Sequence, residues 1–349
     1  MGKMMKAAVF KGIGKMEIEE KEIPQCPKGG ILVKVIACGI CGGDIRNFRN
    51  GLRNGATDQI MGHEIGGEVV EVSGEDTGWK VGDRVAVGPD VSCGKCYYCR
   101  KGMVNLCNDH RMLGTHFPGG FAQYIALPRF VLERGFVEPI PEGMSYDHAA
   151  FAEPVSGVLA CQERAGISYG DTVVVIGDGP VGCLHMEAAK ARGASLIIML
   201  ARGRIEQARK FGFEHLIYNK DPEEATRKVK ELTGPGADVV ICAVPNAAAQ
   251  QQALELVKKR GQIIIYGGVP KNSPMTTLDS NKIHYDEIVI TGSFSYPSVG
   301  IENALKAMHR RDIHTEKYLS AKVPLDRIVE GMDMVTRGEA LKVLVDPWA

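Results

Sequence analysis

The stretch Val173-Val174-Val175-Ile176-Gly177-Asp178-Gly179-Pro180-Val181-Gly182 decides the fold of this chain. Four β-branched residues, which favour a buried strand, run directly into a loop of the pattern G-x-G-x-x-G. The apolar, small-residue stretch that follows, up to Gly193, predicts a helix. A strand before the loop and a helix after it indicate a dinucleotide-binding turn, because the glycines admit a pyrophosphate to the helix N-terminus. The predicted cofactor-binding residues of this loop are Gly177, Gly179, Pro180, Val181 and Gly182.

From about residue 172 onward, strands and helices alternate along the chain. Alternation of this kind predicts an α/β domain with a doubly wound parallel sheet of the Rossmann type. The expected strands are 172–176, 196–200, 239–243 and 262–266, and the expected helices are 181–192 and 205–211.

A different texture precedes this domain. Short apolar runs broken by glycine fill residues 6–130 and predict a glycine-rich, mainly β domain. After residue 290 only about sixty residues remain, too few for a third domain, so we expect the chain to return to the first one. The predicted domains are a metal-binding one formed by 1–155 and 293–349 and a nucleotide-binding one formed by 156–292.

Composition excludes several classes of function. The 349 residues carry 42 Lys plus Arg and 42 Asp plus Glu, so no excess charge attracts nucleic acid or an anionic membrane. This balance favours a small, roughly neutral substrate. The N-terminus lacks the apolar run of a signal peptide, so we expect a cytoplasmic protein. Ten cysteines in a reducing compartment point to metal ligands and not to disulfides.

Four cysteines lie within fifteen residues in the pattern C-x2-C-x2-C-x7-C. Four thiolates can close a tetrahedron around Zn(II) and leave no coordination place open, which is typical of a structural site. The predicted ligands of this structural zinc are Cys93, Cys96, Cys99 and Cys107.

A second set of metal-ligating residues is mixed in character. Cys41 lies in the motif C-G-I-C-G-G-D, and the pair His63-Glu64 follows it at about twenty residues in G-H-E-I-G-G-E. A thiolate, an imidazole and a carboxylate suit a catalytic zinc that keeps one place free for water or substrate. We therefore expect one structural and one catalytic zinc in each chain.

The order of these motifs resembles the zinc-containing medium-chain alcohol dehydrogenases. The resemblance covers nearly the whole chain, and the pair Glu153-Pro154 makes it similar to the polyol branch that includes sorbitol dehydrogenase. It implies a GroES-like catalytic domain with a zinc lobe. It also implies that Cys41, His63 and either Glu64 or Glu153 hold the catalytic zinc, and that Asp44 accepts a hydrogen bond from the His63 ring. The zinc would act as a Lewis acid while hydride moves between the substrate carbon and the nicotinamide.

Two residues depart from the family pattern. Members usually carry Ser or Thr at the place of Gly43, where a hydroxyl relays the substrate proton, and many carry histidine at the place of Arg46. Zinc binding survives both changes, whereas the proton route must use water or another side chain.

Cofactor preference is usually set at the end of the next strand, where an acidic residue selects NAD. Here Ala201 is followed by Arg202 and Arg204, which suit the 2'-phosphate of NADP; if the arginines are only solvated surface residues, NAD serves instead. Gly267 would approach the nicotinamide ribose, and by resemblance Lys342 would reach the pyrophosphate.

The expected substrate is a secondary alcohol, namely a polyol, a sugar alcohol or a sugar-derived compound, or the matching carbonyl. Alternatives are an amino-alcohol, as in L-threonine dehydrogenases, or a non-catalytic NADPH-binding protein, because Gly43 lacks the relay hydroxyl. A complete catalytic metal set argues against a binding protein and against a zinc-free quinone reductase. We also expect a homo-oligomer, either a tetramer or a dimer.

Overall fold

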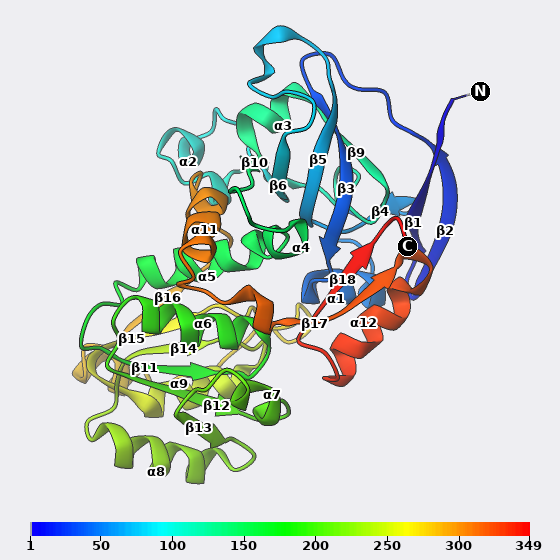
Figure 1. Ribbon diagram of the computed structural model, residues 1–349. Helices are drawn as coiled ribbons and strands as arrows, with labels where there is room; N and C mark the ends of the chain where they lie inside the picture. Colours follow the sequence, from blue (N-terminus) through cyan, green and yellow to red (C-terminus); the bar gives the residue numbers. More distant parts are fainter. Residues whose placement is uncertain (1) are drawn as a thin grey trace. The chain divides into compact units, whose positions relative to one another are not determined.

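In the computed structural model, which describes residues 2–349, the chain forms two compact units (Figure 1). The first unit contains the chain up to Ser156, together with Tyr296–Arg310 and Tyr318–Ala349. The second contains Gly157–Ser295 and Arg311–Lys317. Within the described residues, no helix is both long enough and apolar enough to span a bilayer.

The second unit is built on a parallel sheet of six strands in the order β13-β12-β11-β14-β15-β16. Helix α6 lies on one face and helices α8 and α9 on the other, as Figure 1 shows. Val174 and Ile176 are buried between the sheet and the helices on the second face, which explains the near-continuous apolar strand sequence. The elements are β11 (Thr172–Ile176), α6 (Pro180–Ala191), β12 (Leu196–Ala201), α7 (Ile205–Arg209), β13 (His215–Tyr218), α8 (Pro222–Thr233), β14 (Ala237–Cys242), α9 (Ala247–Leu256), β15 (Val257–Ile265), α10 (Ser280–Tyr285), β16 (Val289–Gly292) and the 3-10 turn η3 (Thr315–Lys317).

The first unit is mainly β. Its larger sheet has the path β10-β6-β5-β3-β18-β17, with β9 also paired to β3, and a three-stranded sheet has the order β2-β1-β4. The strands are β1 (Met4–Gly12), β2 (Lys15–Glu22), β3 (Ile31–Gly39), β4 (Gln59–Ile60), β5 (Glu64–Val72), β6 (Arg84–Gly88), β7 (Asp90–Val91), β8 (Arg111–Met112), β9 (Tyr124–Leu127), β10 (Phe136–Pro139), β17 (Leu319–Pro324) and β18 (Lys342–Asp346).

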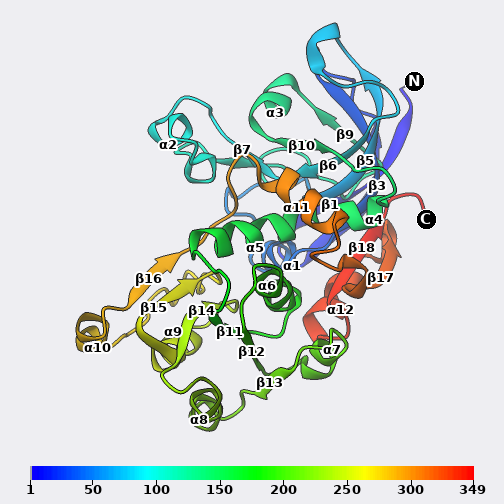
Figure 2. The same cartoon turned by 60° about the vertical axis from the view of Figure 1, so that its left-hand side comes forward.

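Short helices connect these strands. In both views of the ribbon, α2 lies on a loop that extends away from the strands of the first unit (Figures 1 and 2). The boundary between the units falls inside α5. The helices and 3-10 turns are α1 (Gly42–Asn50), η1 (Glu75–Thr77), α2 (Tyr97–Arg100), η2 (Val104–Leu106), α3 (Arg129–Arg134), α4 (Tyr146–Ala149), α5 (Ala152–Arg164), α11 (Gly300–His309), η4 (Leu325–Arg327) and α12 (Ile328–Arg337).

The unit boundaries differ from those expected at Ser156, which lies in the first unit, at residues 293–295, which lie in the second, and at one longer segment. Residues Arg311–Lys317 belong to the second unit, although they were expected in the first. Their contacts explain the difference, because His314 Nδ1 lies 3.0 Å from Glu187 Oε1 and the Lys317 ammonium lies 5.9 Å from the ring centroid of Phe211.

Candidate active site

Three potential metal ligands come together in the first unit. Cys41 is the N-cap of α1, His63 precedes β5, and Glu64 is the first residue of that strand. One ligand atom from each lies within 4.8 Å of the other two. One thiolate, one imidazole and one carboxylate make the donor set of a catalytic zinc, which leaves the fourth place for substrate.

The ring of His63 is oriented by a buried carboxylate. Asp44 Oδ1 lies 3.2 Å from His63 Nδ1, and Asp44 Oδ2 accepts a hydrogen bond from the Cys41 N–H at 3.0 Å. Burial opposes a charged imidazole, but Asp44 and Cys41 outweigh it and raise the pKa of His63 well above its ordinary value. Because Nδ1 faces Asp44, the ring is held with Nε2 available to a metal, which would displace the proton there.

Glu64 has a cationic partner that we had expected elsewhere. The ammonium of Lys342, in β18, lies 2.7 Å from Glu64 Oε1 and also donates to the Ile40 carbonyl at 3.3 Å. A Cβ on Gly39 would lie 1.8 Å from Glu64 Oε2, so only glycine leaves room for this carboxylate. Lys342, assigned by resemblance to the cofactor pyrophosphate, is therefore bound to Glu64 in this structure; its role toward the cofactor stays a prediction.

Glu153, the alternative carboxylate ligand, lies in the first turn of α5. It is not part of the three-residue cluster, which contains Glu64. Burial raises the pKa of Glu153 to about 8, while His63 and Lys342 favour its charged form and Glu64 opposes it. Glu153 is thus electrostatically coupled to the cluster without completing it.

The position of Gly43 faces the cluster. A Cβ placed there would lie 3.6 Å from Cys41 Sγ and 3.9 Å from His63 Cε1, which are ordinary contacts. A serine hydroxyl would therefore reach the site, as the family pattern implies. The same Cβ would lie 4.0 Å from Arg46 Nη2, so the guanidinium occupies the neighbourhood of the missing hydroxyl.

The four predicted structural ligands form a second cluster, on the loop that carries α2. Three of the distances between their Sγ atoms are 3.5, 3.9 and 4.0 Å. A zinc tetrahedron with Zn–S bonds of about 2.3 Å has edges of about 3.8 Å, so the cysteines fit one ion. Backbone N–H groups of Cys99 and Asn108 lower the pKa of Cys96 to about 6, which favours a thiolate.

The glycine loop of the second unit has the geometry that a pyrophosphate needs. A Cβ on Gly182 would lie 2.0 Å from the Gly177 carbonyl oxygen, so the loop can close onto α6 only with glycine there. Gly179 is the N-cap of α6, with Pro180 as the first helical residue and Val181 the second, and it offers no side-chain cap of its own. The N–H groups at this helix start are available to an anion.

Asp178 joins this loop to the turn that follows β12. One carboxylate oxygen accepts three consecutive backbone N–H groups, those of Arg202 at 2.9 Å, Gly203 at 2.8 Å and Arg204 at 2.5 Å. The Arg204 guanidinium extends back to the loop, since a Cβ on Gly179 would lie 3.9 Å from its Nη1 atom. Arg202, in contrast, is exposed.

Packing within the second unit already constrains both Ala201 and Gly267. Ala201 is fully buried at the end of β12 and pairs with Tyr218 of β13. A Cβ on Gly267 would meet the backbone of Val244 at 2.5 Å, so close packing already requires glycine there. Their contacts with a cofactor stay predictions.

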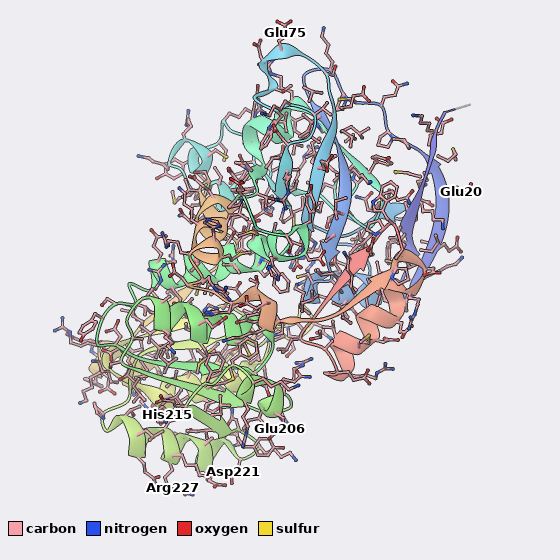
Figure 3. All side chains as sticks on the ribbon, in the orientation of Figure 1. Glu20, Glu75, Glu206, His215, Asp221 and Arg227 are labelled. Carbon is pink, nitrogen blue, oxygen red and sulfur yellow. The ribbon has the colours of Figure 1, made fainter. Side chains whose placement is uncertain are left out.

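Sequence reasoning missed two relationships at the nucleotide site. Asp178 was seen only as the variable residue of the glycine pattern, although a carboxylate between two glycines is a signal for backbone capping. Lys220 was not considered. Its ammonium lies 5.3 Å from the ring centroid of Tyr218, the residue of β13 that pairs with Ala201 at the end of β12. Figure 3 labels two residues of the helices that follow β12 and β13, namely Glu206 of α7 and Asp221, the N-cap of α8.

Comparison with known families gives two matches along the chain. Residues 27–135 match the alcohol dehydrogenase GroES-like domain, and residues 180–310 match the zinc-binding dehydrogenase domain. The first contains the cysteine lobe, Cys41 and His63, and the second begins inside the glycine loop.

Individual relatives match over almost the full length. Sorbitol dehydrogenase of Bacillus subtilis is 35% identical, with 98% of this chain and 97% of the relative covered. D-arabitol-phosphate dehydrogenase of Enterococcus avium is 31% identical, with 96% and 95% covered. A crystal structure of a zinc-binding dehydrogenase from Sinorhizobium meliloti, bound to NADP, aligns with a TM-score of 0.87 at 29% identity and covers 99% of this chain and 100% of that one.

Proposed function

The chain belongs to the zinc-containing medium-chain alcohol dehydrogenases, polyol branch, and on that premise we propose that it oxidises a secondary hydroxyl of a polyol or sugar-derived alcohol, or reduces the matching carbonyl. The observation that carries the proposal is the open cluster of Cys41, His63 and Glu64 in a chain that also has a complete dinucleotide loop. The names of relatives that act on sorbitol and on D-arabitol phosphate support the substrate class.

The reaction removes a hydride from the carbinol carbon and a proton from its hydroxyl, and the hydride reduces the oxidised nicotinamide at C4. When bound, zinc supplies Lewis-acid chemistry that lowers the pKa of the hydroxyl. Cys41 and Glu64 bring the negative charge that balances the metal, and Asp44 fixes the orientation of His63. Because Gly43 has no hydroxyl, the substrate proton must leave through water or another side chain.

We propose two zinc ions in each chain, one in the cluster around Cys41 and one in the four-cysteine lobe. The two donor sets share no residue. Changing Cys41 to Ser should lower the zinc content by one and abolish turnover without unfolding the chain, because the catalytic cluster is open and the lobe is intact.

We also propose that NADP is preferred to NAD. Arg202 and Arg204 supply two guanidinium groups at the turn after β12, and Ala201, the last residue of that strand, is not acidic. A guanidinium pairs with a 2'-phosphate through charge-assisted hydrogen bonds, which supports a preference of roughly ten- to a hundredfold.

Self-association belongs to the proposal as well. Strand β16 forms one edge of the six-stranded sheet, and Val289 on it is 50% exposed. An open strand edge with an exposed apolar side chain supports pairing with a second copy. Light scattering across protein concentrations would measure the oligomeric state.

The test is a turnover screen of the zinc-loaded enzyme across polyols, sugar acids, polyol phosphates and amino-alcohols with each cofactor. Zinc content is measured on the same samples, and Arg202→Ala is compared with the unaltered chain. We expect polyol-type oxidation that prefers NADP and loses this preference in Arg202→Ala. Turnover of L-threonine alone, or cofactor binding without turnover of any alcohol, would overturn the proposal; a preference for NAD that Arg202→Ala leaves unchanged would overturn only the cofactor assignment.

A further inference from the structure

The guanidinium of Arg46 lies beside the catalytic cluster. Arg46 is in α1, one turn after Cys41, and its Nη2 atom would be 4.0 Å from a Cβ on Gly43. That Cβ would in turn contact both Cys41 Sγ and His63 Cε1. A permanent positive charge thus lies close to the proposed metal ligands.

The Arg46 guanidinium forms no direct hydrogen bond or ion pair with another described residue. Across residues 2–349, the same holds for Arg53, which follows α1. The next arginine of the helix behaves differently, because Arg49 lies 3.8 Å from Asp333 Oδ1. Asp44, the acidic residue of the helix, is already engaged by His63 and the Cys41 N–H.

A second arginine, Arg53, is near enough for its charge to act on Arg46. Burial and the positive charge of Arg53 lower the pKa of Arg46, while Cys41 and Asp44 raise it. Both arginines are exposed to solvent, so an incoming anion can reach their guanidinium groups. A planar guanidinium matches the paired oxygens of a carboxylate or phosphate.

We propose that Arg46, assisted by Arg53, binds a carboxylate or phosphate group of the substrate, so that the enzyme acts on a sugar acid or polyol phosphate and not on a neutral polyol. The inference rests on the proposed function and narrows its substrate class. It departs from the expectation of a roughly neutral substrate, because the zero net charge of the whole chain does not fix the local charge at a site. The anion belongs to the substrate and not to the cofactor, because the glycine loop and the two arginines after β12 already offer sites for the cofactor phosphates.

The experiment compares substrates that differ only in charge. D-glucitol is paired with D-glucitol 6-phosphate and L-iditol with L-idonate, and kcat/KM is measured for each with the zinc-loaded enzyme. Variants are Arg46→Ala and Arg46→Lys, with Arg49→Ala as the matched control on the same helix. Calorimetric titration of D-glucitol 6-phosphate into the cofactor-free enzyme gives a readout independent of turnover.

We expect the unaltered chain to prefer at least one charged partner by about ten- to a hundredfold, on the scale of a charge-assisted contact. In Arg46→Ala the ratio of charged to neutral kcat/KM should fall to near one, and binding of the phosphate should weaken by a similar factor. Arg46→Lys should retain part of the preference, and Arg49→Ala should retain all of it.

Two outcomes would overturn the inference while the proposed function stands. One is an unaltered enzyme that oxidises the neutral polyols better than the charged ones. The other is an Arg46→Ala variant that weakens NADP and NAD binding but keeps the charged-to-neutral ratio, which would assign Arg46 to the cofactor. If no compound is turned over, the proposed function fails, and calorimetry still decides whether Arg46 binds the anion.

Discussion

The ammonium of Lys342 and the carboxylate of Glu64, 278 positions apart in the chain, form a buried ion pair at 2.7 Å from Nζ to Oε1. Lys342 is 5% exposed and Glu64 is 1% exposed, so neither charge can be hydrated once its partner is lost. Changing Lys342 to Met should lower the free energy of unfolding by about 3–5 kcal/mol, the usual cost of leaving one member of a buried pair alone.

Urea unfolding measures this loss in a Cys41→Ser background, where the four-cysteine lobe keeps its zinc but no catalytic zinc neutralises Glu64. The control is Lys322→Met, because Lys322 pairs with Asp147 at 2.9 Å nearer the surface. It should lose less than about 1 kcal/mol. Equal effects of the two substitutions would show that Glu64 is stabilised by something other than Lys342.

The four-cysteine lobe should depend on metal for its structure. Cys96→Ser removes one of the four thiolates, so zinc content should fall by one ion per chain and the melting temperature should drop. Cys26→Ser is the matched control, since Cys26 lies outside both clusters. Elemental analysis and thermal unfolding would be run on both, and an unchanged zinc content in Cys96→Ser would contradict the assignment.

Gly43→Ser should speed catalysis. The added Cβ meets only ordinary contacts, and the hydroxyl would supply the proton relay that the chain lacks. We expect kcat to rise at least severalfold and the pH profile of kcat to change. Positioned acid–base groups typically contribute roughly a hundredfold or more, which sets the upper scale of the effect. The control is Gly42→Ser, at an exposed position of the same helix start where an added Cβ would meet nothing. It should change neither kcat nor the pH profile. A slower Gly43→Ser enzyme would mean that water transfers the proton better than a hydroxyl there.

Asp178→Asn should weaken the binding of both cofactors. The neutral amide cannot hold three N–H groups as a carboxylate does, so the turn that carries Arg202 and Arg204 loses its support. Fluorescence titration should show a loss of about five- to thirtyfold for NADP and NAD alike, the range of 1–2 kcal/mol. Asp221→Asn, a matched change at a helix cap in the same unit, should leave cofactor binding unchanged and cost little stability, because Asn caps a helix about as well as Asp. Tighter NADP binding in Asp178→Asn would show that the carboxylate repels the phosphate and does not position the turn.

The features that could be predicted from the sequence are those set by neighbouring residues. The strand 172–176 and its loop were predicted because β-branched residues and glycines act through local backbone geometry, and the structure has this strand with the same bounds. The four cysteines were assigned to one site because fifteen residues of chain keep the thiolates close together, and their clustering confirms that they meet. Cys41 and His63 were assigned to one site from their motifs and residue types, with support from the resemblance, although their spacing alone does not require contact.

The contacts between distant residues were decided by tertiary packing. Once charged and carbonyl groups are buried, they must find hydrogen-bond partners among the groups that the fold brings near them. Nothing in the sequence around Lys342 indicates that its ammonium faces Glu64; antiparallel pairing of β18 with β3 and of β3 with β5 brings the two strands together. Likewise, the sequence identifies Asp178 only as a loop residue. The parallel register of β11 and β12 is what places its carboxylate beside the N–H groups of Arg202 to Arg204. A motif specifies which chemical groups a site contains, whereas the free energy of burying a charge determines which of those groups meet.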